Sequence, residues 1–176
     1  MLNEQIPSIP WLQLTTPYGR GTAIPQLIEQ EQYIELAELV EHQGTLWQVT
    51  PWALLVLLKK LASKNTGDVS VQEVELYLAV AHAISEDYLD PSYSVQTMQE
   101  LLDVKYLWMD HEENDELEWE EETPKGYEQK AFVSYYYFSY ILLQEAVPIF
   151  AAVIAHNKET ADRLTELLTL LQQLDK

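Results

Sequence analysis

Apolar residues recur at intervals of three and four positions along most of this chain, which is the spacing of one face of an α-helix. The pattern predicts helices over residues 24–30, 32–41, 51–64, 70–89, 94–109, 127–144, 147–155 and 159–174. No stretch shows the clear alternation of apolar and polar residues that is typical of a half-buried strand. We therefore expect an all-α protein with about 6–8 helices.

Several helix boundaries depend on residues that start or stop helices. Thr50 is a good N-cap, and Pro51 suits the first helical position, where its missing N–H costs nothing. We expect Gly44 to end the helix over 32–41, because glycine readily takes the positive φ of a helix stop. Pro91 should end one helix, and Ser94 should cap the next.

Proline and glycine are concentrated in residues 1–22, which predicts an extended N-terminal arm without regular structure. The arm also contains tryptophan and leucine, so we expect it to pack on the rest of the protein. Residues 1–176 are otherwise expected to form a single helical domain, because a chain of this length is typical of one domain with one core.

Two segments of the chain are faintly alike, which bears on the architecture. VTPWALLVLL at 49–58 and AVPIFAAVIA at 146–155 both place proline third, ahead of a dense apolar helix. A short polar loop and an amphipathic helix follow each of them. Repeated helix pairs of this kind predict an α-solenoid, in which each pair buries one face against the next. A compact helical bundle is the alternative architecture.

The segments TPYGRGTAIPQLIE (16–29) and HQGTLWQVTPWALLVLL (42–58) resemble a bacterial group of HEAT-repeat-like proteins. Later, YEQKAF and AVPIFAAVIA look like the second unit of that group. Trp47 and Val49 depart from the group's pattern, which has tyrosine and alanine there, and residues 66–123 have no counterpart. The resemblance implies a HEAT-like α-α superhelix that binds other macromolecules, and it transfers no catalytic residue.

The charge of the chain limits its partners. It has 29 Asp and Glu against 10 Lys and Arg, a net charge of −19. Such a field repels nucleic acid and anionic membranes and attracts basic proteins.

There is no cysteine, and the first residues lack a signal-peptide pattern, so we expect a cytoplasmic protein. The apolar tract over 131–155 is interrupted by Gln144, Glu145 and Pro148, which argues against a membrane span.

The acidic residues are densest over residues 110–122, DHEENDELEWEEE, where nine of thirteen positions are acidic. We expect residues 110–123 to form an acidic loop or insertion, either simply solvated or used for docking. The tryptophans that flank or enter this stretch, Trp108 and Trp119, favour an interface, since tryptophan is uncommon in a purely solvated segment. The candidate partner-binding residues here are Glu112, Glu113, Asp115, Glu116, Glu118, Trp119, Glu120 and Glu121.

Tyr135, Tyr136 and Tyr137 are weaker candidates for the same surface. Three successive tyrosines point around a helix, so they cannot all face one core, and tyrosine is favoured at interfaces. The simpler interpretation is a helix buried between two neighbours. The sequence leaves both interpretations open.

We expect neither an enzyme nor a metal or cofactor site. The histidines are scattered, with no pair spaced to seat a metal on one helix face, and the acidic stretch has aspartate where a calcium-binding loop needs glycine. No nucleophile elbow or phosphate-binding glycine loop occurs. The composition does not indicate an oligomeric state.

Our leading hypothesis is a non-catalytic acidic binding protein that captures a basic protein partner. Its cognate partner would be a bacterial toxin such as a nuclease, and this chain would be the immunity protein. The alternative is a helical-repeat scaffold or adaptor with no toxin partner, whose acidity serves solubility. An enzyme that uses buried acids ranks last.

Overall fold

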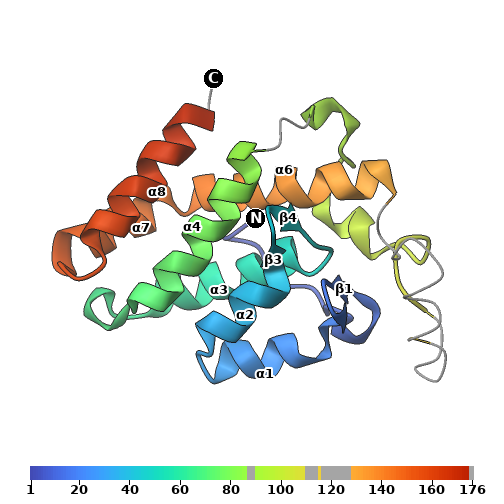
Figure 1. The fold of residues 1–176 in the computed structure, drawn as a ribbon, viewed down its shortest axis with the longest axis horizontal. Coiled ribbons are helices and arrows are strands. Elements are labelled where there is room, and N and C mark those ends of the chain that lie inside the picture. The colour runs from blue at the N-terminus through green and yellow to red at the C-terminus, as the bar shows by residue number, and fades with distance from the viewer. Residues whose placement is uncertain (87–89, 110–114, 116–127, 175–176) are drawn as a thin grey trace.

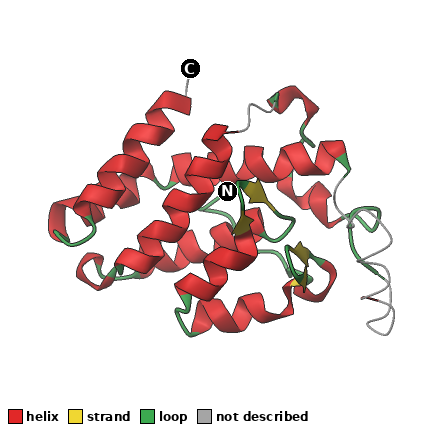
Figure 2. Cartoon of the chain, viewed as in Figure 1, coloured by secondary structure: helices red, strands yellow, loops and turns green. Residues whose placement is uncertain are grey.

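The computed structural model covers residues 1–176 and describes all of them except 87–89, 110–114, 116–127 and 175–176. The described residues are mostly helical, which confirms the all-α character (Figure 2). The α-helices are α1 (Ile24–Glu29), α2 (Tyr33–Val40), α3 (Thr50–Ser63), α4 (Val71–Glu86), α6 (Gln129–Glu145), α7 (Val147–His156) and α8 (Ala161–Leu174).

The helices lie in two rows. Figure 1 shows α2, α4 and α8 side by side in front of α3, α6 and α7. Within the front row α4 packs against both α2 and α8, and behind it α3 packs against α6. The rows meet where α4 contacts α6 and where α7 contacts α8.

The core lies between these rows and follows the sequence pattern closely. Helix α3 is apolar on nearly all sides, and its residues from Thr50 to Leu55 are buried without exception. Helix α8 is amphipathic, and it buries Leu164, Leu167 and Leu171 along one face. The intervals of three and four predicted this face correctly.

Helices α6 and α7 are separated by a bend of 49°. Pro148 lies in the first turn of α7, where proline is tolerated. In the described part of the chain no single helix has the length and apolarity needed to cross a membrane, and only this bent pair, taken together, meets that test.

The structure also contains a few short strands that the sequence pattern did not indicate. Two short hairpins form, β1 (Thr15–Thr16) with β2 (Gly19–Arg20), and β3 (Glu41–His42) with β4 (Thr45–Leu46). Strands of two residues are too short to show an alternating pattern, which is why the sequence did not reveal them.

The second hairpin replaces the helix stop expected at Gly44. Gln43 and Gly44 both have positive φ, 52° and 80°, as a two-residue hairpin turn requires. Thr50 does not cap α3 with its side chain. Its hydroxyl instead accepts a hydrogen bond from the Trp47 N–H at 2.9 Å and donates one to the Val40 carbonyl. Thr50 therefore ties the base of the hairpin to the end of α2.

The arm over residues 1–22 also contains regular structure, contrary to expectation. It includes the 3-10 turn η1 (Trp11–Gln13) and the β1–β2 hairpin, and it leads into η2 (Gly21–Ala23). Gly21 is needed for close packing, since a Cβ there would come within 2.7 Å of the Val49 side chain. The arm is thus held against the start of α3.

The helix expected over residues 94–109 is absent. The 3-10 turn η4 (Pro91–Tyr93) precedes this segment, and a second 3-10 turn, η5 (Met98–Leu102), lies within it. Thr97, not Ser94, begins η5 through a capping box with Glu100. Tyr106, Leu107 and Trp108 are all buried.

Another short turn, η3 (Thr66–Asp68), joins α3 to α4. The Asn157 side chain donates hydrogen bonds to the Thr66 and Val69 carbonyls at 3.2 and 2.9 Å. Its oxygen accepts from the Thr160 N–H at 3.3 Å. Asn157 therefore connects the turn after α7 to the turn before α4.

Candidate functional site

Of the acidic candidates, Asp115 alone falls among the described residues. It forms an ion pair with Arg20, in which Arg20 Nε lies 2.6 Å from Asp115 Oδ2 and Nη2 lies 2.8 Å from Oδ1. Such a two-bonded pair between a guanidinium and a carboxylate is short and directional. The other candidates lie outside the described residues: Glu112, Glu113, Glu116, Glu118, Trp119, Glu120 and Glu121.

The same arginine joins three segments of the chain. Arg20 Nη1 donates to the Leu12 carbonyl and to the Trp108 carbonyl, both at 2.8 Å. The Trp108 N–H also donates to the Gln13 carbonyl at 2.9 Å. Arg20 therefore fixes the arm, the segment before the acidic stretch and Asp115 to one another. We call this group of contacts the Arg20 joint.

The Trp108 ring forms part of the Arg20 joint. The guanidinium carbon of Arg20 lies 4.2 Å from the ring centroid, which is a favourable cation–π distance. Trp108 is buried, so the expectation that it serves as an exposed interface anchor was wrong. Its ring packs under the arginine instead of facing a partner.

The tyrosine run lies on α6 and is mainly structural. Tyr135 and Tyr136 are buried, and Tyr137 is half-buried and packs against the core. The Tyr136 hydroxyl accepts from the Leu46 N–H at 3.1 Å and donates to the Gly44 carbonyl at 3.2 Å, which holds the second hairpin. Burial raises the pKa of Tyr135 well above its ordinary value. Tyr135 and Tyr136, the weaker partner-binding candidates, therefore lie in the core with their side chains buried.

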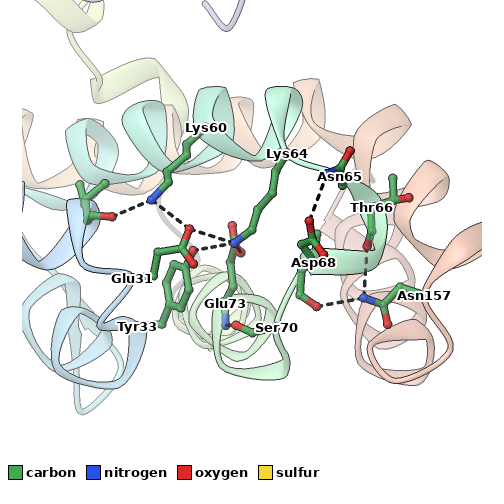
Figure 3. A network of polar contacts seen from close by, with 12 residues as sticks. Glu31, Tyr33, Lys60, Lys64, Asn65, Thr66, Asp68, Ser70, Glu73 and Asn157 are labelled. Atoms are coloured by element: carbon green, nitrogen blue, oxygen red, sulfur yellow. Dashed lines mark hydrogen bonds and ion pairs between the residues drawn. The ribbon is translucent and has the colours of Figure 1, made fainter.

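A second polar cluster surrounds Lys64, which follows the last residue of α3 (Figure 3). Lys64 Nζ lies 3.0 Å from Glu73 Oε2, 3.1 Å from Glu31 Oε1 and 3.2 Å from the Tyr33 hydroxyl. Glu73, in the first turn of α4, is only 1% exposed, and its other oxygen accepts from the Tyr77 hydroxyl at 3.1 Å. We call these contacts the Lys64 joint.

Electrostatics in the Lys64 joint favour the charged lysine. Burial lowers the pKa of Lys64, but hydrogen bonds to Glu73 and Tyr33 outweigh it and raise the pKa above its ordinary value. Burial, followed by the nearby Glu73 charge, raises the pKa of Tyr33 and that of Tyr77. Both tyrosines therefore remain neutral, and Lys64 remains charged over the physiological range.

The Lys64 joint is not arranged for acid–base catalysis. Each Glu73 oxygen already has a hydrogen-bond partner within the protein, and the carboxylate is nearly inaccessible to a substrate. A general base needs access to the proton that it abstracts. The contacts instead bind the α1–α2 connection to the end of α3 and the start of α4.

Most of the described lysine and arginine side chains contact groups of the protein itself. Lys60 pairs with Glu31 at 3.0 Å, and Arg163 pairs with Glu75 at 2.7 Å. Lys59 donates to the Leu2 and Glu4 carbonyls at 2.6 and 2.5 Å. By contrast, several acidic side chains are exposed to solvent: Glu29, Glu35, Glu38, Asp103, Glu159 and Asp162. The accessible charge is therefore strongly negative.

The sequence did not identify Arg20 or Lys64, although one signal was present. Arg20 is the only lysine or arginine among residues 1–58, in a chain rich in acids. An isolated cation of that kind is a natural partner for a carboxylate.

Within the described residues, no group of three or more His, Cys, Asp or Glu is placed to hold a metal ion. No protein-family model, curated protein or solved structure matches this chain.

Proposed function

We propose that this protein is a non-catalytic acidic binding protein that captures a basic protein partner in the cytoplasm. The observation that supports the proposal is the imbalance of accessible charge. The chain carries a net charge of −19, and Arg20, Lys60, Lys64 and Arg163 are paired with its own carboxylates. The surface left for a partner is therefore dominated by carboxylates, which attract a cationic protein and speed its association.

The partner that fits this chemistry best is a bacterial toxin such as a nuclease, with this chain as its immunity protein. A nuclease binds phosphates with a cationic surface, and an acidic protein can occlude that surface by occupying it. The acidic stretch over 110–122 concentrates nine carboxylates and supplies Trp119 as an apolar anchor. Helical-repeat folds commonly present extended surfaces for such partners.

We propose further that the two rows of helices form a HEAT-like α-α superhelix. The neighbour-to-neighbour packing of α2, α4 and α8 in front of α3 and α6 supports this architecture. In a solenoid each helix pair contacts chiefly the next pair. A compact bundle is the competing description, because α4 also contacts α6 between the rows.

Affinity capture tests the proposed function. Immobilised full-length protein is exposed to a lysate of its source cells, and the captured protein is identified and purified. Its affinity is then measured at low and high salt. We expect a basic partner whose binding weakens as salt rises, because screening reduces attraction between exposed charges. A toxin should also lose its activity at a one-to-one ratio.

Two charge-matched variants locate the interaction. The first carries Glu116→Lys, Glu118→Lys, Glu120→Lys and Glu121→Lys, and the control carries Glu29→Lys, Glu35→Lys, Glu38→Lys and Glu159→Lys. We expect the first to weaken binding far more than the control, although both change net charge equally. A partner that binds both variants as tightly as the original chain, without salt dependence, would contradict the proposal. A captured basic protein with no toxin activity would favour the scaffold alternative.

A further inference from the structure

The first four residues of the chain form a turn that lies against distant helices. The Glu4 N–H donates to the Met1 carbonyl at 3.0 Å, which closes the turn. Beside the turn is a cavity of about 480 Å³, and its lining includes Met1, Lys59 of α3 and Glu145 of α6. The start of the chain therefore meets α3 and α6 at one place.

Glu145 binds the start of the chain through both of its carboxylate oxygens. The Met1 α-ammonium donates to Glu145 Oε1 at 2.9 Å, and the Leu2 N–H donates to Oε2 at 2.8 Å. Burial raises the pKa of Glu145, but the hydrogen bonds from the Leu2 N–H and the α-ammonium outweigh burial and lower the pKa below its ordinary value. The carboxylate is therefore charged at neutral pH and holds an ammonium and an amide together.

Lys59 binds the same turn through groups of the opposite polarity. Its Nζ donates to the Leu2 carbonyl at 2.6 Å and to the Glu4 carbonyl at 2.5 Å. Glu145 accepts from main-chain donors, and Lys59 donates to main-chain acceptors. None of these four hydrogen bonds uses a side chain of residues 1–4. We call Glu145 and Lys59 the N-terminus cradle.

Glu4 is a second carboxylate near the Met1 α-ammonium, but it is the weaker partner. Its Oε1 lies 3.7 Å from the α-ammonium nitrogen, and its side chain is 67% exposed. Glu145 lies closer and is 35% exposed. Water screens an exposed pair more strongly, so Glu145 should account for most of the attraction.

We infer that the N-terminus cradle is a binding site for the unblocked N-terminus of a peptide, occupied in this structure by the chain's own residues 1–4. A free α-amine carries the positive charge that pairs with Glu145, whereas an acylated or extended one is a neutral amide. Capture of an N-terminal amine is a recurring mode of peptide recognition. Blocking the Met1 α-amine therefore releases the turn and exposes Lys59. This site acts independently of the basic partner proposed above.

The rate of acetylation at the Met1 α-amine tests the first part of the inference. Full-length protein is treated with a limiting amount of an acetylating ester at neutral pH, and the modified peptides are quantified by mass spectrometry. We expect the α-amine of Glu145→Gln to react about two- to fivefold faster than that of the original protein, which is the range for loss of a partly exposed ion pair. The amine must leave Glu145 before it can react.

Glu4→Gln is the matched control, because it makes the same chemical change beside the same ammonium. Its α-amine should react as fast as that of the original protein. Thermal unfolding checks that both variants are folded.

The reactivity of Lys59 tests the second part without a substitution. Two forms of the full-length protein are compared with the original, one acetylated enzymatically at the Met1 α-amine and one with Gly-Ser placed before Met1. We expect Lys59 to be acetylated about two- to fivefold faster in both, because the carbonyls that hold it move away with the turn. Lys158, which is exposed and remote in sequence, should react equally in all three forms.

Two results together support the N-terminus cradle: faster reaction of the Met1 α-amine in Glu145→Gln alone, and faster reaction of Lys59 alone after blocking. Equal α-amine rates in Glu145→Gln and the original protein overturn the inference. Equal acceleration by Glu145→Gln and Glu4→Gln also overturns it, since a general effect of charge would then explain the result. An unchanged Lys59 rate in the blocked forms overturns it as well, because the turn would stay bound without its ammonium.

Discussion

The Lys64 joint and the Arg20 joint use similar chemistry in different surroundings. In each, one cation bonds a carboxylate and lies over an aromatic ring, Tyr33 for Lys64 and Trp108 for Arg20. The difference lies in the carboxylate. Glu73 is 1% exposed inside the helical core, whereas Asp115 is 23% exposed at the edge of the molecule.

The different exposure of the two carboxylates gives the two joints different roles. A carboxylate that water cannot reach depends on its protein partners, so removing Lys64 alone should weaken the packing of α1 to α4. A partly hydrated carboxylate can still meet an outside cation. The Arg20 joint therefore holds the arm in place through a carboxylate that stays partly exposed.

Replacing Lys64 should have the largest effect on stability. In Lys64→Met the buried Glu73 loses its cation, and breaking a buried pair from one side costs about 3–5 kcal/mol. Urea unfolding measures the loss. The double variant Lys64→Met with Glu73→Gln should recover most of it, because a neutral amide no longer needs the cation and still accepts from Tyr77.

Lys158→Met serves as the control for that experiment. Lys158 is exposed, so its loss should change the unfolding free energy by no more than about 0.5 kcal/mol. If Lys64→Met cost no more than Lys158→Met, the Lys64 joint would not support the core, and the contrast with Arg20 would disappear.

Replacing Arg20 should cost less than replacing Lys64. Arg20→Met leaves the Leu12 and Trp108 carbonyls without this donor, but Asp115 can turn to water. We expect a loss of about 1–3 kcal/mol in urea unfolding, because hydrogen bonds from a charged group are lost and the Trp108 carbonyl is partly buried. Tryptophan fluorescence should change as well, since the Trp108 ring loses the cation above it.

Arg163→Met is the matched control for Arg20. The Arg163 side chain is 52% exposed and pairs with Glu75 and Glu166 on the surface. Surface pairs of this kind contribute between zero and about 1 kcal/mol. An Arg20→Met variant as stable as Arg163→Met would show that the arm is not held by Arg20. One as unstable as Lys64→Met would remove the distinction between the two joints.

The sequence predicted the parts of the fold that depend on local pattern. Pro51 and the dense apolar run after it predicted α3, and the leucines at helical spacing predicted the buried face of α8. These features depend on residues within a few turns of one another, so a single sequence contains the whole signal.

Long-range pairs were not predictable in the same way. Arg20 and Asp115 are 95 positions apart, and nothing local distinguishes Asp115 from the acids around it. Trp108 looked like an interface residue because it precedes the acidic stretch, but its burial depends on the arm folding over it. The tyrosine run was open to two interpretations for the same reason, since the hairpin that contacts Tyr136 is 90 positions away.

Glu31 offers the smallest test, because it shares Lys64 with Glu73 but is 42% exposed. Hydrogen bonds from Lys60 and then Lys64 lower the pKa of Glu31 below its ordinary value of 4.5. Because this pKa is depressed in the folded state, the stabilisation is present above the unfolded pKa and is lost as pH falls through the folded pKa. Glu31→Gln should therefore lower stability at neutral pH by less than about 1 kcal/mol.

The same variant should match the original protein at low pH, where Glu31 is protonated in both states. Glutamine suits this position, since Glu31 has a φ of 55° and Gln43 takes a φ of 52° elsewhere in the chain. Urea midpoints measured across the acid range give the result, with the exposed Glu35→Gln as control. A constant difference between Glu31→Gln and the original protein at every pH would mean that its contribution is not ionic. The charge of Glu31 would then contribute nothing to the free energy of unfolding beyond the contribution of the buried Lys64–Glu73 pair.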